Sequence, residues 1–178
     1  VQPHLAEALK QTVIVENRGG AGGNLAGAEG VRNGGDNHTF LLNPSTTESV
    51  NPLMFASMPF DPQRDLRPVG LLANSQLFLF VRSSLGVDTL EAFVEYARKQ
   101  PNPLNYGSAG NGTTPHLAGE LLKQATGMQA THAPYRGVAP AIQDLAAGQI
   151  DFAFGPATVF PMVQAGKLKV LAVASRQR

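Results

Sequence analysis

Residues 104–115 read LNYGSAGNGTTP, and the rest of the chain is organised around them. The first three residues predict an apolar strand, whereas Pro115 is typical of the first turn of a helix. Thr113 and its neighbour are expected to cap that helix, and the glycines between strand and helix let the backbone approach a ligand closely. Free N–H groups at the positive end of the helix, with the hydroxyls of Ser108 and Thr113, therefore predict a site for phosphate, sulfate or carboxylate.

The same residues do not match the standard motifs of nucleotide-binding proteins or hydrolases. No Lys-Ser or Lys-Thr pair follows the glycines, and the spacing G-x-G-x-x-G fails at Pro115, which argues against a Walker-type ATPase. Tyr106 stands where the motif G-x-S-x-G needs its first glycine, so Ser108 is not predicted to be a nucleophile. On the motif alone, a turn that only joins a strand to a helix stays an open alternative.

Composition excludes several classes of protein. The 178 residues are compatible with one domain or two small lobes. A net charge of +1 with 15% charged residues offers no surface for a nucleic-acid backbone, so no nucleic-acid partner is expected. The absence of cysteine excludes a disulfide scaffold and thiolate metal sites. No apolar run is as long as a membrane span, so we expect a soluble chain from which any signal peptide has been removed.

Strands and helices are predicted to alternate along the chain. Strands are expected at residues 13–15, 39–42, 68–81, 104–106, 131–133, 150–154 and 168–174, and helices at 3–10, 24–31, 46–50, 89–100, 115–124, 138–147 and 158–165. Such alternation predicts a mostly parallel sheet, in which ligands bind at the carboxyl ends of the strands. A second glycine-rich turn at 19–23 and a run of hydroxyls at 43–47 follow the first two strands. Three helix starts are therefore expected to face one ligand.

Several sequence blocks together resemble one family. The blocks are VENR at 15–18 with AGGN at 21–24, PFDP at 59–62 with Asp65 and PV at 68–69, YGSAGNGT at 106–113 with HLA at 116–118, PYRG at 134–137 with PA at 140–141, GQID at 148–151, and GKL at 166–168 with LAV at 171–173. In this order and spacing, the chain resembles the Bug-type periplasmic solute-binding receptors that serve tripartite tricarboxylate transporters.

The resemblance implies an α/β fold of the two-lobed, type II periplasmic-binding-protein kind, with mostly parallel sheets flanked by helices. It implies a periplasmic receptor, not an enzyme, that captures a small carboxylate such as a di- or tricarboxylate, an amino acid or a related organic acid. The partners would be that ligand and the membrane subunits of the transporter, with no cofactor, no metal and no catalytic residue. Carried over onto this sequence, the ligand contacts fall on Ser45, Thr46, Ser108, Ala109, Gly110, Asn111, Gly112, Thr113 and Gly137.

The resemblance also predicts the division into lobes. Residues 1–76 would be a partial first lobe, 77–172 a second lobe with hinge strands at both ends, and 173–178 the start of the return to the first lobe. The family places another strand and a glycine-rich loop before the opening helix, so we expect the first lobe to be incomplete. That strand would lie between 13–15 and 39–42, and its absence predicts self-association through the first lobe.

Two other classes of function stay open. The effector-binding domain of a transcription regulator can share this architecture, but it would need a helix-turn-helix and a basic face, and neither is found. An enzyme that binds a phosphorylated ligand is the third class. His116 is interpreted as a polar residue of a helix start, Arg136 as a solvated surface charge and Asp151 as a structural hydrogen-bonding group. The four histidines lack the spacing of metal ligands.

Overall fold

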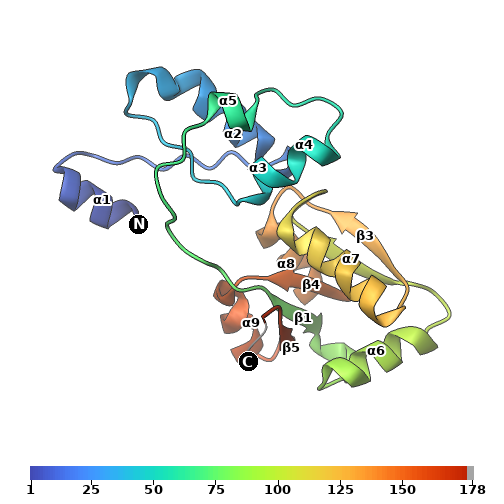
Figure 1. Cartoon of the computed structure of the whole chain (residues 1–178). Helices are drawn as coiled ribbons and strands as arrows, with labels where there is room; N and C mark the ends of the chain where they lie inside the picture. Colours follow the sequence, from blue (N-terminus) through green and yellow to red (C-terminus); the bar gives the residue numbers. More distant parts are fainter. Residues whose placement is uncertain (176–178) are drawn as a thin grey trace.

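The computed structural model of the chain describes residues 1–175 (Figure 1). A five-stranded sheet organises its second half, in the order β3-β2-β4-β1-β5. The strands are β1 (Phe78–Arg82), β2 (Leu104–Ser108), β3 (Ala130–Pro134), β4 (Phe152–Gly155) and β5 (Leu168–Val173). Strand β2 is parallel to β3 and β4, whereas β1 is antiparallel to β4 and to β5. Four strands therefore run in one direction and β1 in the other, which confirms the predicted mostly parallel sheet.

Helices cover both faces of the sheet. Helices α6 (Leu90–Lys99) and α7 (Thr114–Thr126) pack on one face, and α8 (Val138–Ala146) and α9 (Phe160–Gln164) on the other. Short 3-10 turns, η3 (Ser83–Leu85) and η4 (Ala157–Val159), follow β1 and β4. Figure 1 shows the glycine-rich stretch between β2 and α7 lying beside the first half of the chain. The β-α alternation of this half is thus as the sequence predicted.

The core is split between the two faces because neighbouring side chains of a strand point in opposite directions. On β1, Leu79 and Val81 belong to the cluster under α6 and α7, whereas Phe80 belongs to the cluster under α8 and α9. Tyr106 is fully buried and stacks on Phe152 with ring centroids 5.2 Å apart. Burial of one such large side chain contributes about 1.5–3 kcal/mol. These two clusters make the sheet the stable framework that carries the loops at its carboxyl end.

The first half of the chain contains helices but, among the described residues, no strand. Its elements are α1 (Gln2–Leu9), η1 (Ala21–Gly23), α2 (Asn24–Asn33), η2 (Gly34–Asp36), α3 (Thr46–Ser49), α4 (Asn51–Met54) and α5 (Pro62–Asp65). The strands predicted at 13–15 and 39–42 are therefore wrong, and the one predicted at 68–81 is reduced to β1. A strand needs a neighbour that accepts its ladder hydrogen bonds, and the described residues offer these segments none. Several of their apolar side chains are exposed: Ile14 is 79% exposed and Phe40 71%.

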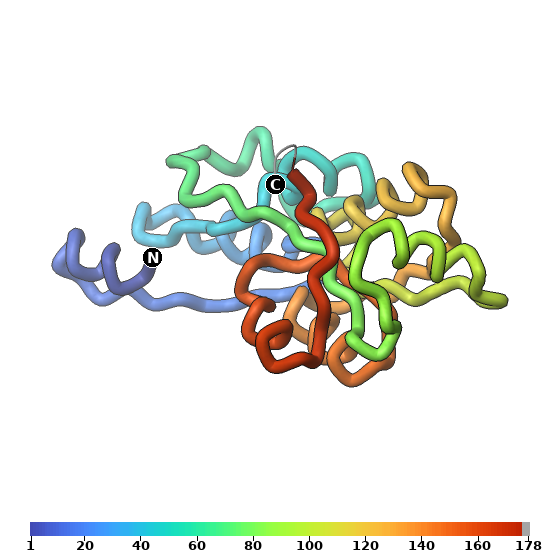
Figure 2. Tube along the Cα trace, turned by 90° about the horizontal axis from the view of Figure 1, so that it is seen from below, coloured from blue at the N-terminus to red at the C-terminus, as the bar shows by residue number. Residues whose placement is uncertain are grey.

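Helix α1 stands apart from the other helices in both views, and none of its residues is buried (Figures 1 and 2). Figure 2 also shows β5 running alongside β1, as their pairing requires. The lobe boundaries at residues 76 and 172 stay predictions, and the last three residues of the predicted return segment lie outside the described part. Among residues 1–175, no helix has the length and apolar character needed to span a membrane.

Candidate functional site

Glycines bring three turns from different parts of the chain into contact. A β-carbon placed on Gly22 would lie 3.2 Å from the carbonyl oxygen of Asn111, and one on Gly110 would lie 3.3 Å from the carbonyl oxygen of Tyr135. A β-carbon on Gly19 would come within 2.8 Å of the carbonyl oxygen of Arg136. Only residues without a side chain allow so close an approach. The turn at 19–23, the segment 108–114, which ends on the first residue of α7 (hereafter the glycine loop), and the turn at 135–137 therefore form one site at the carboxyl end of β2 and β3.

The glycine loop is held by its own hydrogen bonds. The Gly110 N–H donates to Ser108 Oγ over 3.0 Å, and Thr113 Oγ1 donates to the carbonyl oxygen of Gly110 over 2.6 Å. The Gly112 N–H donates to His116 Nδ1 over 3.1 Å. Both hydroxyl residues are buried, with Ser108 1% exposed and Thr113 7%. In this structure, then, the two hydroxyls shape the loop rather than point into solvent.

The predicted helix start is correct in position but not in its capping bond. Thr113 occupies the N-cap of α7 and Pro115 lies in the first turn, yet the Thr113 side chain caps no N–H of the helix. Its hydroxyl bonds to Gly110 instead, because the φ of +120° at that glycine turns the carbonyl toward it. The N–H groups of Ala109, Asn111 and Thr114 have no hydrogen-bond partner among residues 1–175. These three amides are the donors that the loop keeps available.

A buried polar cluster on the opposite side of the site was missed from the sequence. Asn51 is fully buried, and its Nδ2 donates to the carbonyl oxygen of Gly22 over 3.0 Å and to Asn24 Oδ1 over 2.7 Å. Thr47 Oγ1 donates to the same carbonyl oxygen over 3.4 Å. This cluster ties the turn at 19–23 to α3 and α4. Nothing in the spacing of these residues indicates that they meet, because the contacts join three separate segments.

Two side-chain oxygens of this region are buried without a partner among the described residues, Asn51 Oδ1 and Thr46 Oγ1. A β-carbon on Gly112 would lie 3.3 Å from Asn51 Oδ1, so that oxygen borders the glycine loop. Ser45, the other residue predicted here, is exposed at the start of α3. An unpaired buried polar atom costs about 1–3 kcal/mol. Such atoms are therefore expected where a ligand or an ordered water completes the bonding.

Gly137 occupies the N-cap of α8, as the resemblance implied for a further helix start. Its N–H and that of Val138 have no hydrogen-bond partner among the described residues. Arg136 is exposed, in agreement with its interpretation as a surface charge. Asp151 accepts from Arg82 Nε over 3.0 Å and from the Asn105 N–H over 2.8 Å, which confirms its structural role.

Two histidines that were not among the predicted ligand-binding residues contact the glycine loop. His132 Nε2 lies 2.6 Å from Ser108 Oγ, and the His132 ring is stacked between Tyr106, with centroids 4.8 Å apart, and His116, at 4.2 Å. Burial lowers the pKa of His132 to about 4, and the charge of His116 acts in the same direction. Burial also lowers the pKa of His116, against the opposing effect of Glu120. Both rings are therefore neutral at pH 7.

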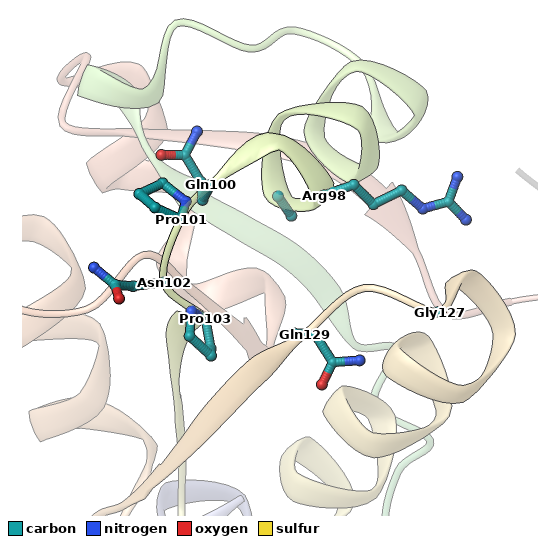
Figure 3. A pocket seen from close by; sticks show the side chains of 8 residues that line it. Arg98, Gln100, Pro101, Asn102, Pro103, Gly127 and Gln129 are labelled. Carbon is teal, nitrogen blue, oxygen red and sulfur yellow. The ribbon is translucent and has the colours of Figure 1, made fainter.

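Two cavities lie away from these loops. One, of about 200 Å³, is lined by Arg98 at the end of α6, by the Gln100–Pro103 turn and by Gly127 and Gln129 (Figure 3). The other, of about 250 Å³, is apolar and lies between α6, α7 and β5. Neither is lined by a predicted site residue. Within residues 1–175, no group of three or more His, Cys, Asp or Glu side chains could hold a metal ion.

Comparison with known proteins agrees with this architecture. The sequence profile of the tripartite tricarboxylate transporter family receptors matches residues 1–178. BugT of Bordetella pertussis is 31% identical over 177 residues, 98% of this chain and 54% of BugT. A solved structure of an R. palustris protein with adipate is 33% identical with a TM-score of 0.94, and covers 99% of this chain and 60% of that one. MatC from Rhodopseudomonas palustris, solved with bound malate, is 28% identical over the same shares, with a TM-score of 0.88.

The chain spans about half the length of the curated relatives it matches. The profile match nevertheless covers every residue, and the two ligand-containing structures share its fold over nearly its whole length. The predicted α/β fold of the periplasmic-binding-protein kind and the predicted Bug-type resemblance are both confirmed. The chain belongs to the tripartite tricarboxylate transporter family of receptors.

Proposed function

We propose that this chain is part of an extracytoplasmic receptor that captures a small carboxylate for a tripartite tricarboxylate transporter. The ligand would be a di- or tricarboxylate, or a related organic acid, and the receptor would deliver it to the transporter's membrane subunits. It would act in the periplasm by binding and release, without catalysis. Adipate and malate, found in two structures of similar proteins, are both dicarboxylates and support this class of ligand.

One observation carries the proposal: unpaired donors from separate segments meet at one place. The glycine loop offers the N–H groups of Ala109, Asn111 and Thr114, and the α8 start offers that of Gly137. Backbone N–H groups at the start of a helix favour an anion, because the helix dipole adds a partial positive charge. Backbone N–H groups can therefore bind a carboxylate at a site that contains no lysine or arginine side chain to pair with the ligand.

The opposite wall of the site supports the same ligand class. Thr46, with its unpaired buried hydroxyl, can donate to a second carboxylate or to a substituent of the ligand, and Asn51 Oδ1 can accept from a ligand hydroxyl. Ser45 lies beside them with its side chain exposed. We include Ser45, Thr46, Gly137 and the glycine loop in the proposed contact surface, and we add Asn51, whose Nδ2 holds the turn at 19–23 and whose Oδ1 is unpaired.

Calorimetric titration of the chain with adipate, malate, inorganic phosphate and a nucleoside triphosphate tests the proposal. A matched pair of variants locates the site. Gly110→Ala forces a side chain into a φ of +120°, whereas Gly34 has a φ of −72° and open space around it, so Gly34→Ala is the control. Backbone strain of about 1–3 kcal/mol predicts that Gly110→Ala weakens carboxylate binding at least about fivefold.

The outcomes separate the three classes of function. Binding of a carboxylate that Gly110→Ala weakens and Gly34→Ala leaves unchanged supports the receptor. Preference for the nucleotide or for phosphate over every carboxylate would instead indicate an enzyme or another protein that binds a phosphorylated ligand. An effector-binding domain of a regulator would bind its ligand in the same way, but only the receptor is expected to associate with the transporter's membrane subunits.

A further inference from the structure

The glycine loop is fastened at both ends by imidazole rings. At its start, Ser108 Oγ lies 2.6 Å from His132 Nε2, and at its end the Gly112 N–H donates to His116 Nδ1 over 3.1 Å. The two rings stack on each other with centroids 4.2 Å apart and an interplanar angle of 30°. A single imidazole pair, one ring from β3 and one from α7, therefore fixes the loop between them.

The bond to Gly112 sets the protonation state of His116. An N–H can donate to Nδ1 only when that nitrogen carries no proton, so the ring must be neutral while the bond exists. A proton on His116 removes the acceptor and leaves the Gly112 amide without it. Two charged rings at a stacking distance of 4.2 Å would also repel each other. A proton on His116 is thus in conflict with the loop geometry, and a second proton on His132 would add repulsion between the rings.

The surroundings of the pair contain few other charges. Glu120, on α7, accepts from the Tyr106 hydroxyl over 2.6 Å and from Lys123 Nζ over 2.8 Å. Tyr106, on β2, covers the other face of the His132 ring. Glu120 favours protonation of both histidines and Lys123 disfavours it, but burial is the largest effect on each. The desolvated rings therefore stay neutral until the solution is acidic.

We propose that His116 and His132 are positioning residues of the carboxylate site, which hold the glycine loop in its binding geometry only while His116 is neutral, so that ligand affinity falls in acid. The inference rests on the proposed function, since it assigns a pH dependence to ligand binding at the same site. Its direction is specific. Simple attraction between a histidine cation and an anion would raise affinity in acid, whereas loss of the loop's fastening lowers it.

The window follows from the two pKa shifts. The pKa of His116 lies below its ordinary 6.5, and that of His132 is about 4. Affinity is therefore highest at neutral and alkaline pH and decreases as the pH falls below 6.5 toward 4. The ligand's own carboxyl groups also titrate in this range, so the comparison must be made between variants with the same ligand.

Two substitutions of His116 separate positioning from simple packing. In His116→Asn, the side-chain Oδ1 can accept in place of Nδ1 but does not titrate, whereas His116→Leu fills the space and accepts nothing. We expect His116→Leu to bind malate about tenfold more weakly than the natural chain at pH 7.5, because a partly buried N–H loses its partner. His116→Asn should recover most of that loss and bind with less dependence on pH than the natural chain.

Calorimetry with malate at pH 7.5 and pH 5 gives the affinities, and the 15N-resolved amide signal of Gly112 in the ligand-free protein gives a second readout. The inference predicts that this signal titrates with His116 in the natural chain and not in His116→Asn. An affinity that rises in acid, or an equal pH dependence in both proteins, would overturn it. If malate and adipate bind at no pH, the proposed function fails, while the Gly112 titration still decides whether the histidine controls the loop.

Discussion

Gly119 lies in the middle of α7, where its lack of a side chain makes room for Tyr106. A β-carbon at this position would lie 2.3 Å from Cε2 of the Tyr106 ring and 2.8 Å from Cζ. The ring cannot move aside easily. It is fully buried, stacks on Phe152 and His132, and donates its hydroxyl proton to Glu120. Gly119→Ala therefore introduces a steric overlap that the core must absorb.

The expected magnitude is a balance of two effects. Overpacking of a core by one methyl group costs about 1–3 kcal/mol, and an overlap as close as 2.3 Å places this site in the upper part of that range, at about 2–3 kcal/mol. The higher helix propensity of alanine returns about 1 kcal/mol. We expect Gly119→Ala to lower the free energy of unfolding by about 1–2 kcal/mol. For a chain of this length that is a decrease in melting temperature of about 2–8 °C.

Urea unfolding followed by circular dichroism measures the change, with Gly34→Ala as the matched control. No atom lies within 4 Å of a β-carbon at Gly34, so this control should change the free energy of unfolding by less than about 0.5 kcal/mol. Gly119→Ala that is as stable as the natural chain, or more stable, would refute the packing of Tyr106 against α7. The Tyr106 ring stacks on His132, so the same result would also argue against the position of His132 beside the glycine loop.

Two further predictions concern acid and concentration. Burial lowers the pKa of His132 from 6.5 to about 4, so the unfolded chain binds more protons than the folded chain between these values, and the free energy of unfolding should fall as the pH decreases from 6.5 to 4. Urea unfolding of His132→Gln should show a weaker dependence on pH. An unchanged dependence would contradict the pKa shift. Because Ile14 is 79% exposed and Phe40 71%, we propose that the 178-residue chain self-associates. Light scattering should show an apparent mass that rises with protein concentration, and replacement of both residues by serine should reduce this rise. A natural chain that is monomeric at every concentration would contradict the proposal.

Local patterns sufficed to predict the second half of the chain. The helix predicted at 89–100 is α6, at whose start Thr89 accepts from the Ala92 N–H, and the helix predicted at 115–124 is α7, which continues to Thr126 with Gly127 at its C-cap in a left-handed conformation. Each of these signals depends only on residues that are close in sequence. The segments at 13–15 and 39–42 have equally apolar sequences but form no strand, because strand pairing depends on a neighbour that local sequence does not specify.

The backbone segments of the candidate site were predicted from the sequence, but the side chains that hold these segments in place were not. The glycine loop and the N-cap position of Gly137 follow from turn chemistry, which is local. His132 contacts the loop because β3 lies parallel to β2 with Tyr106 opposite His132, and that register is not readable from spacing alone. Asn51 was missed for the same reason, since its partners Gly22 and Asn24 lie 27 or more residues away in sequence.

The central claim is that the unpaired amides of the glycine loop bind a carboxylate. Titration of the 15N-labelled chain with malate or adipate tests it most directly, with amide chemical shifts as the measurement. We predict large shifts for the N–H groups of Ala109, Asn111 and Thr114, and smaller ones for Gly110, whose N–H already donates to Ser108. No shift in the glycine loop at saturating ligand, or shifts confined to the cavity beside Arg98 and Gln129, would contradict the claim.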